Sequence, residues 1–225
     1  MNWGIILFVG YTYGTMIEIS IPIIFKYGTE WELKRVLNTL ETKDWLTKNG
    51  YRFSLPQGLG DFQSQDIDVI KGLIEKEYSP AAYQIAEAAI NRSWDGNCRL
   101  MKKINEKLVG SYMLNELNII LTKYGTQGSY IQPNSIVINI STIPPEFLIK
   151  TVIHESLHLM IETQIRQYDV DHWIKERIVN LIMDAEFKSR FKMDKAPEQS
   201  IVIDGLFRQL YPNLDLILKE SPHVV

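Results

Sequence analysis

The ten residues TVIHESLHLM, at positions 151–160, constrain the fold more than any other part of the sequence. His154 and His158 are four residues apart, so on an α-helix their imidazoles project from neighbouring turns of one face and can hold one ion. Glu155 lies about 100° further round the helix, where it can reach a water on that ion. The stretch therefore predicts a zinc site with Glu155 as general base. The alternative is a pair of histidines on an ordinary amphipathic core helix.

A catalytic zinc needs a third protein ligand, which leaves the fourth position for water or substrate. Ile161 and Gln164 stand where the metzincin continuation requires a glycine and a histidine or aspartate, so that class is excluded. Glu162 continues the motif helix but drifts up its axis, which is typical of a solvated or supporting carboxylate. His172 falls in the first turn of the next helix.

Glu176 is the best placed candidate for the third ligand. The short connection TQIRQYDV is expected to fold the next helix back against the motif helix, and the apolar neighbours of Glu176 indicate a packed helix. The alternative is a surface ion pair of Glu176 with Lys175 or Arg177.

TVIHESLHLM followed by HWIKERIVN resembles the gluzincin zinc metallopeptidases, the thermolysin-like clan, over residues 115–190. The resemblance implies that His154, His158 and Glu176 bind Zn²⁺ and that Glu155 activates the water. The chain departs from the family at Asn180, where an acidic residue commonly orients a ligand histidine. Asp184, one turn later, is a possible substitute for that acidic residue.

The resemblance also implies zinc-dependent hydrolysis of peptide bonds, with a peptide or protein as substrate. The family uses a tyrosine or histidine from outside the motif to stabilise the oxyanion. Tyr130 and His172 are the leading candidates for this catalytic role, and Tyr168 and Arg177 are weaker ones. Two other classes stay open: a non-catalytic zinc-binding or protein-interaction domain that retains the motif, and a zinc hydrolase acting on a non-peptide amide.

The expected fold is α+β and zincin-like. It has a small sheet, an edge strand before the motif helix, and a mainly helical N-terminal half. Residues 1–225 are expected to form one metallopeptidase-like domain, with a helical half at 1–110 and a zinc-site half at 111–225. In the family a substrate lies extended along the edge strand, which implies residues 135–140 here. The alternative is that these residues form an interior strand.

Local signals place the remaining elements. Helical spacing predicts helices at 29–48, 80–92 and 97–109, and alternation predicts strands in LNELNIILTKYG and SIVINIST, either as a hairpin or as neighbours. Ser141 or Thr142 is expected to cap the motif helix, and Asp171 the helix after it. One more short helix and an apolar tail are expected at the end.

Composition excludes several classes of protein. The 24 basic and 27 acidic residues are well mixed, so no nucleic-acid partner is expected. Cys98 is the single cysteine, so neither an intramolecular disulfide nor a cysteine-rich zinc site can form. No apolar run is long enough to span a bilayer, and the apolar residues 1–10 lack the positive start of a signal peptide. A cytoplasmic location is the resulting expectation, and the oligomeric state is open.

Overall fold

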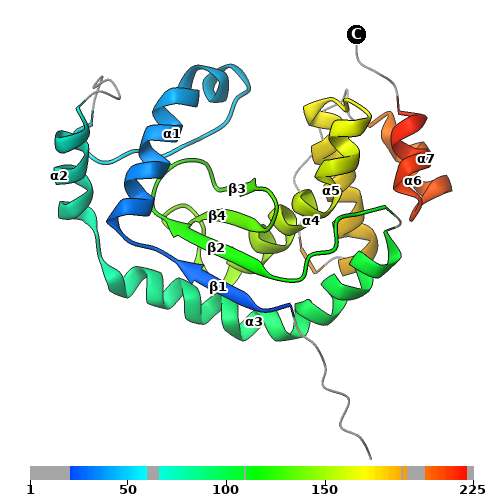
Figure 1. Cartoon of the computed structure of the whole chain (residues 1–225), viewed down its shortest axis with the longest axis horizontal. Coiled ribbons are helices and arrows are strands. Elements are labelled where there is room, and N and C mark those ends of the chain that lie inside the picture. Colours follow the sequence, from blue (N-terminus) through cyan, green and yellow to red (C-terminus); the bar gives the residue numbers. More distant parts are fainter. Residues whose placement is uncertain (1–20, 60–65, 109, 189, 192–200, 222–225) are drawn as a thin grey trace, which may run out of the picture.

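The computed structural model describes residues 21–59, 66–108, 110–188, 190–191 and 201–221. The fold is α+β, with helices around a mixed sheet of four strands in the order β1-β2-β4-β3 (Figure 1). The strands are β1 (Ile23–Lys26), β2 (Leu117–Thr122), β3 (Gly128–Ile131) and β4 (Ser135–Asn139). β1, β2 and β4 pair in parallel, and β3 pairs antiparallel to β4. The apolar residues 1–10 lie outside the described residues.

Helices make up most of the rest of the described chain. They are α1 (Thr29–Lys48), α2 (Ile67–Glu77), α3 (Pro80–Lys107), α4 (Leu148–Gln167), α5 (His172–Phe187), α6 (Ile203–Leu210) and α7 (Leu214–Lys219), with a short 3-10 helix, η1 (Pro145–Phe147), before α4. α1 has the predicted bounds, and it is followed by its C-cap residue Asn49 and by Gly50, whose φ of 73° suits a glycine. Residues 201–221, the described part of the final segment, contain two short helices where one was expected.

The break predicted between residues 92 and 97 does not exist, because α3 is one continuous helix. Gly96, the glycine that suggested the break, lies within the helix, and a Cβ there would meet nothing within 4 Å. Buried side chains on both sides of it, including Trp94 and Cys98, keep one face of α3 in the core. The loss of about 1 kcal/mol for an internal glycine is small compared with this burial.

The strand that precedes the motif helix is interior, which corrects the expectation of an edge at residues 135–140. β4 lies between β2 and β3, and Ile136, Val137 and Ile138 are buried. The edge on this side of the sheet is β3, a short strand that lies between β2 and β4 in the sequence. β2 and β4 are neighbours, as one of the two alternatives required, but they run parallel and so do not form a hairpin.

The sheet and helices share a core that fixes the position of α4. This helix packs against β3 and β4, contacts α3, and is followed by α5, which folds back against it. Val152, Ile153 and Leu157 of α4 are fully buried. The predicted cap of α4 is wrong: Ser141 Oγ donates to the carbonyl of Lys123, and no side chain caps α4.

α5 begins as predicted. Asp171 Oδ1 accepts hydrogen bonds from the backbone amides of Trp173 and Ile174, at 2.8 and 3.4 Å. This cap fixes the start of the helix that carries Glu176. Among all helices in the described ranges, none is long and apolar enough to cross a membrane.

Candidate metal centre

α4 and α5 bring His154, His158 and Glu176 together at one point. Their ligand atoms all lie within 4.8 Å of one another. The two Nε2 atoms are 3.1 Å apart, and Glu176 places Oε2 3.2 Å from His154 Nε2 and Oε1 3.3 Å from His158 Nε2. The three residues predicted as ligands therefore form a possible metal-binding group.

The donor set of this group fits a divalent metal such as zinc. Two imidazole nitrogens and one carboxylate are a common ligand set of catalytic zinc sites. Burial lowers the pKa of His158 to about 4, so this ring is neutral near pH 7 and has a lone pair to offer. Burial opposes the charge of Glu176, but hydrogen bonds with His154 and His158 outweigh it and hold its pKa well below the usual range.

His154 differs from His158 in its electrostatics. Burial opposes its protonation, but the hydrogen bond with Glu176 and the charge of Glu155 outweigh burial and raise its pKa. His154 therefore holds a proton more readily than His158 when no ion is bound, and metal binding must displace that proton.

Glu155 lies beside the group, directly against the edge strand. It is only 7% exposed, and burial raises its pKa to about 7 despite the nearby positive charges of Arg35 and Lys175. A Cβ built on Gly128 of β3 would lie 2.3 Å from Glu155 Oε1. A side chain at this position would require the Glu155 carboxylate or β3 to move.

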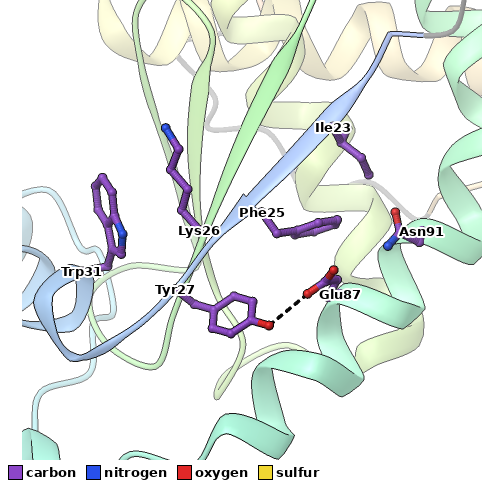
Figure 2. Close-up of a pocket in the computed structure, with 7 residues that line it drawn as sticks. All are labelled: Ile23, Phe25, Lys26, Tyr27, Trp31, Glu87 and Asn91. Atoms are coloured by element: carbon purple, nitrogen blue, oxygen red, sulfur yellow. Dashed lines mark hydrogen bonds between the residues drawn. The ribbon is translucent and has the colours of Figure 1, made fainter.

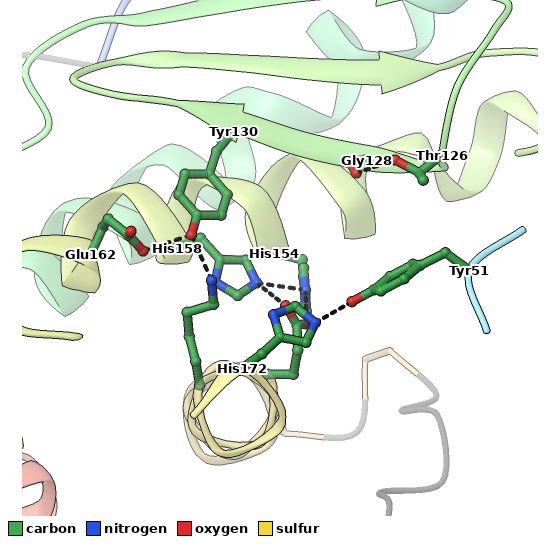
Figure 3. Close-up of polar contacts among 10 residues, drawn as sticks. Tyr51, Thr126, Gly128, Tyr130, His154, His158, Glu162 and His172 are labelled. Carbon is green, nitrogen blue, oxygen red and sulfur yellow. Dashed lines mark hydrogen bonds and ion pairs between the residues drawn. The ribbon is translucent and has the colours of Figure 1, made fainter. Parts of the chain in front are cut away.

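Tyr130 stacks its ring on His158, with centroids 5.0 Å apart and an angle of 11° between the planes. Its hydroxyl donates to Glu162 Oε2 at 2.6 Å (Figure 3). The same hydroxyl accepts from Lys175 Nζ at 2.8 Å. Glu162 also accepts from Arg166 Nε at 2.8 Å. Glu162 thus supports the ring that covers His158, and it is not one of the grouped ligands.

His172 lies one helical turn before Glu176 on α5, so both side chains lie on one face. Its Nε2 is hydrogen-bonded to the hydroxyl of Tyr51, which reaches in from the segment after α1 (Figure 3). The rings of Trp45, Tyr51 and Trp173 surround His172. The positions of Tyr130 and His172 near the ligand group are compatible with their predicted roles, and those roles stay predictions.

Two residues near the group were missed by sequence reasoning. Tyr51 contacts the side chain of His172, which is 121 positions away in the sequence. Arg35 contacts the side chain of Ser129, which is 94 positions away. The negative charges of Glu176 and Glu155 contribute, after burial, to a raised pKa of Tyr51. No periodic pattern or motif in the sequence marks either residue.

The remaining candidates lie elsewhere or make other contacts. Arg177 forms a two-point ion pair with Asp204, at 2.8 and 2.6 Å, which ties α5 to α6. Within the described residues, neither Asn180 nor Asp184 makes a side-chain hydrogen bond to a ligand histidine, and Asp184 is exposed. His158 Nδ1 is buried without a partner, so the expected support of a ligand histidine by an acidic side chain is missing.

A cavity lies away from the ligand group, beside β1, the edge strand at the other side of the sheet from β3. It has a volume of about 480 Å³ and is lined by Ile23, Phe25, Lys26, Tyr27, Trp31, Glu87 and Asn91 (Figure 2). The main polar contact inside it joins the Tyr27 hydroxyl to Glu87 Oε2, at 3.2 Å. None of the grouped ligands lines this cavity.

No protein-family model, curated protein or solved structure matches this chain. The class is therefore defined by the fold and the site alone. The chain is an α+β protein that carries a possible His-His-Glu metal site on two packed helices, next to a sheet edge.

Proposed function

We propose that this chain is a zinc-dependent peptidase. The observation that carries the proposal is the convergence of His154, His158 and Glu176, with the Glu155 carboxylate beside them and against β3. Bound zinc would supply a Lewis acid that polarises the scissile carbonyl and lowers the pKa of water. A non-catalytic metal site would not need an additional buried carboxylate, which costs free energy to desolvate.

Glu155 is the proposed general base. It takes a proton from the attacking water and returns it to the departing amine. Burial raises the pKa of this carboxylate, which makes it a better proton acceptor than an exposed glutamate. Burial, the main cause of that pKa, also keeps bulk water from competing for the carboxylate.

The free side of β3 is the proposed binding line for the substrate backbone. The Asn139 amide donates to the Gln127 carbonyl at 2.9 Å, so these two residues form a hydrogen-bonded pair. Bonded and non-bonded pairs alternate along antiparallel strands. The backbone N–H and C=O groups of Gly128 and Tyr130 therefore point away from β4, toward the free side of β3. The Gly128 carbonyl accepts from Thr126 Oγ1 at 3.0 Å but keeps a second lone pair. An extended peptide paired here would run along the strand whose Gly128 adjoins Glu155.

The pair of Tyr51 and His172 is the proposed donor to the oxyanion. A neutral histidine and a tyrosine carry one N–H and one O–H between them, and their mutual hydrogen bond uses one of these. One donor is therefore left for the substrate, whichever tautomer His172 adopts. The hydroxyl of Tyr130 is occupied between Glu162 and Lys175, so we favour the His172 pair over Tyr130.

Glu155→Gln is the direct test of this function. The variant is expected to keep its zinc and to lose hydrolysis of a random peptide library by at least about 100-fold, because the base is removed while the ligands stay. Products are identified by mass spectrometry, and zinc is measured on the same sample. Undiminished cleavage by the variant would reject the mechanism, and absence of cleavage by the zinc-loaded wild type would favour a non-catalytic metal protein.

A further inference from the structure

A second, smaller cavity lies between α1 and the edge strand β3. It has a volume of about 150 Å³ and is lined by Arg35, Asn38, Thr39, Thr42, Trp45, Leu46, Thr126 and Ser129. The six residues from α1 recur at helical spacing and form one face of that helix. The cavity is thus bounded on one side by α1 and on the other by β3 and the residue Thr126 that precedes it.

The cavity adjoins the proposed catalytic centre at two points. Arg35 donates to Ser129 Oγ at 3.0 Å and to Thr126 Oγ1 at 2.9 Å, and its charge acts on Glu155. Trp45 stacks on Tyr51, with ring centroids 5.6 Å apart. Trp45 is 49% exposed, so an apolar face stands open beside the metal site.

Most polar groups around the cavity are already used. Thr39 Oγ1 donates to the carbonyl of Arg35, and Thr42 Oγ1 donates to the carbonyl of Asn38, both at 2.8 Å. These bonds engage the two hydroxyls with the helix backbone, so their methyl groups and the side chains of Trp45 and Leu46 are available to line the space. The surface offered to a ligand is therefore mainly apolar, with the guanidinium of Arg35 behind it.

The pleat of β3 directs a substrate side chain into this cavity. Gly128 and Tyr130 face α4, so Ser129 faces the other way, toward α1. Residues opposite each other in paired strands share a face. A peptide paired with β3 therefore sends the side chain beside Ser129 into the cavity, while the side chains of its two neighbours point to the opposite face, toward α4.

We propose that this cavity, called here the α1 pocket, binds one apolar substrate side chain and so sets the specificity of the enzyme. This inference rests on the proposed peptidase function. A space of about 150 Å³ accepts a ring the size of benzene, so leucine, isoleucine, methionine and phenylalanine fit. Lysine and arginine are rejected, because their charge would meet that of Arg35 in a space where no acidic side chain forms part of the lining.

The test separates binding from hydrolysis. Zinc-loaded Glu155→Gln protein is incubated with a random peptide library, and the retained peptides are sequenced. The α1 pocket predicts at least tenfold enrichment of apolar over basic residues at one position. Thr42→Phe, which fills the pocket, is expected to abolish that enrichment, and Asn38→Phe at the exposed rim provides a second filling variant.

Thr47→Phe is the matched control for the filling variants. Thr47 also lies on α1 and bonds the carbonyl four residues back, at Lys43, but it is exposed and does not line the pocket. The control should keep the enrichment. The α1 pocket would be overturned if peptides were retained without a preference, or if the preference were unchanged by both filling variants. It would also be overturned if no peptide were retained at all. A preference that persists while the wild type cleaves nothing would reject the hydrolytic function and leave the pocket as a peptide-binding site.

Discussion

Gly128 and Glu155 occupy adjoining space, such that a Cβ on Gly128 would lie 2.3 Å from Glu155 Oε1 and 2.8 Å from Thr151 Cγ2. The carboxylate of the proposed base therefore lies in the space that a side chain at position 128 of β3 would occupy. Gly128 does not have a positive φ, so its requirement is for space and not for backbone freedom. This contact links the proposed peptide-binding line directly to the proposed chemistry.

Gly128→Ala should therefore impair catalysis. The added methyl group must displace Glu155 or shift β3, and we expect kcat/KM to fall by about 100-fold, because errors of about 1 Å in catalytic position have this effect. Zinc content should be unchanged. Gly72→Ala in α2 is the matched control, since a Cβ there meets nothing within 4 Å, and it should leave activity intact. Equal activity of both variants would contradict the proposed role of Glu155.

Tyr51→Phe distinguishes the two proposed oxyanion donors. It should lower kcat by about 10- to 100-fold with little change in KM, because the variant loses either the donating hydroxyl or the partner that orients the donating N–H of His172. Tyr130→Phe keeps the stacking on His158 and removes the bonds to Glu162 and Lys175. It should mainly cost about 1 kcal/mol of unfolding free energy, measured by urea denaturation. The opposite result for the two variants would assign the donor to Tyr130.

Glu32 predicts a pH dependence of stability that is separate from the metal centre. It is 1% exposed, accepts from the Lys123 amide at 2.8 Å and from the Tyr83 hydroxyl, and leaves Oε2 without a partner. Burial raises its pKa to about 7, against bonds that lower it. Because the folded-state pKa is above the unfolded one, the stability that this group contributes is present below about pH 4.5 and is lost as the pH rises through about 7.

Glu32→Gln should remove this contribution. The unfolding free energy of the wild type, relative to that of the variant, should fall by about 2 kcal/mol between pH 5 and pH 8. Urea denaturation of both zinc-loaded proteins at the two pH values measures the difference, and the comparison cancels other groups that titrate in both. A difference that rises with pH would show that Glu32 is ionised and stabilised in the folded protein.

The ligand group could be predicted from the sequence because its geometry is local. Helical periodicity alone places His154 and His158 on one face, and a short connection brings the helix of Glu176 back to them. The cap at Asp171 was likewise readable from residue type and position. These features depend on spacing along the chain, which a sequence contains directly.

The surroundings of the group depend on contacts distant in sequence, and these could not be predicted. β3 is four residues long and contains a glycine, so it resembles a turn until its pairing with β4 is known. Arg35 and Tyr51 come from the N-terminal half and gain their meaning only from the packing of α1 beside β3. The division into two halves of one domain stays a prediction.

The zinc content of purified protein tests the central claim most directly. We predict one zinc ion per chain by elemental mass spectrometry, and loss of most of it in His154→Ala and in Glu176→Gln, since each removes one of the three ligands. Glu162→Gln, on the same helix but outside the group, should keep full occupancy. A wild type without stoichiometric zinc after loading, or full occupancy in both ligand variants, would contradict the account.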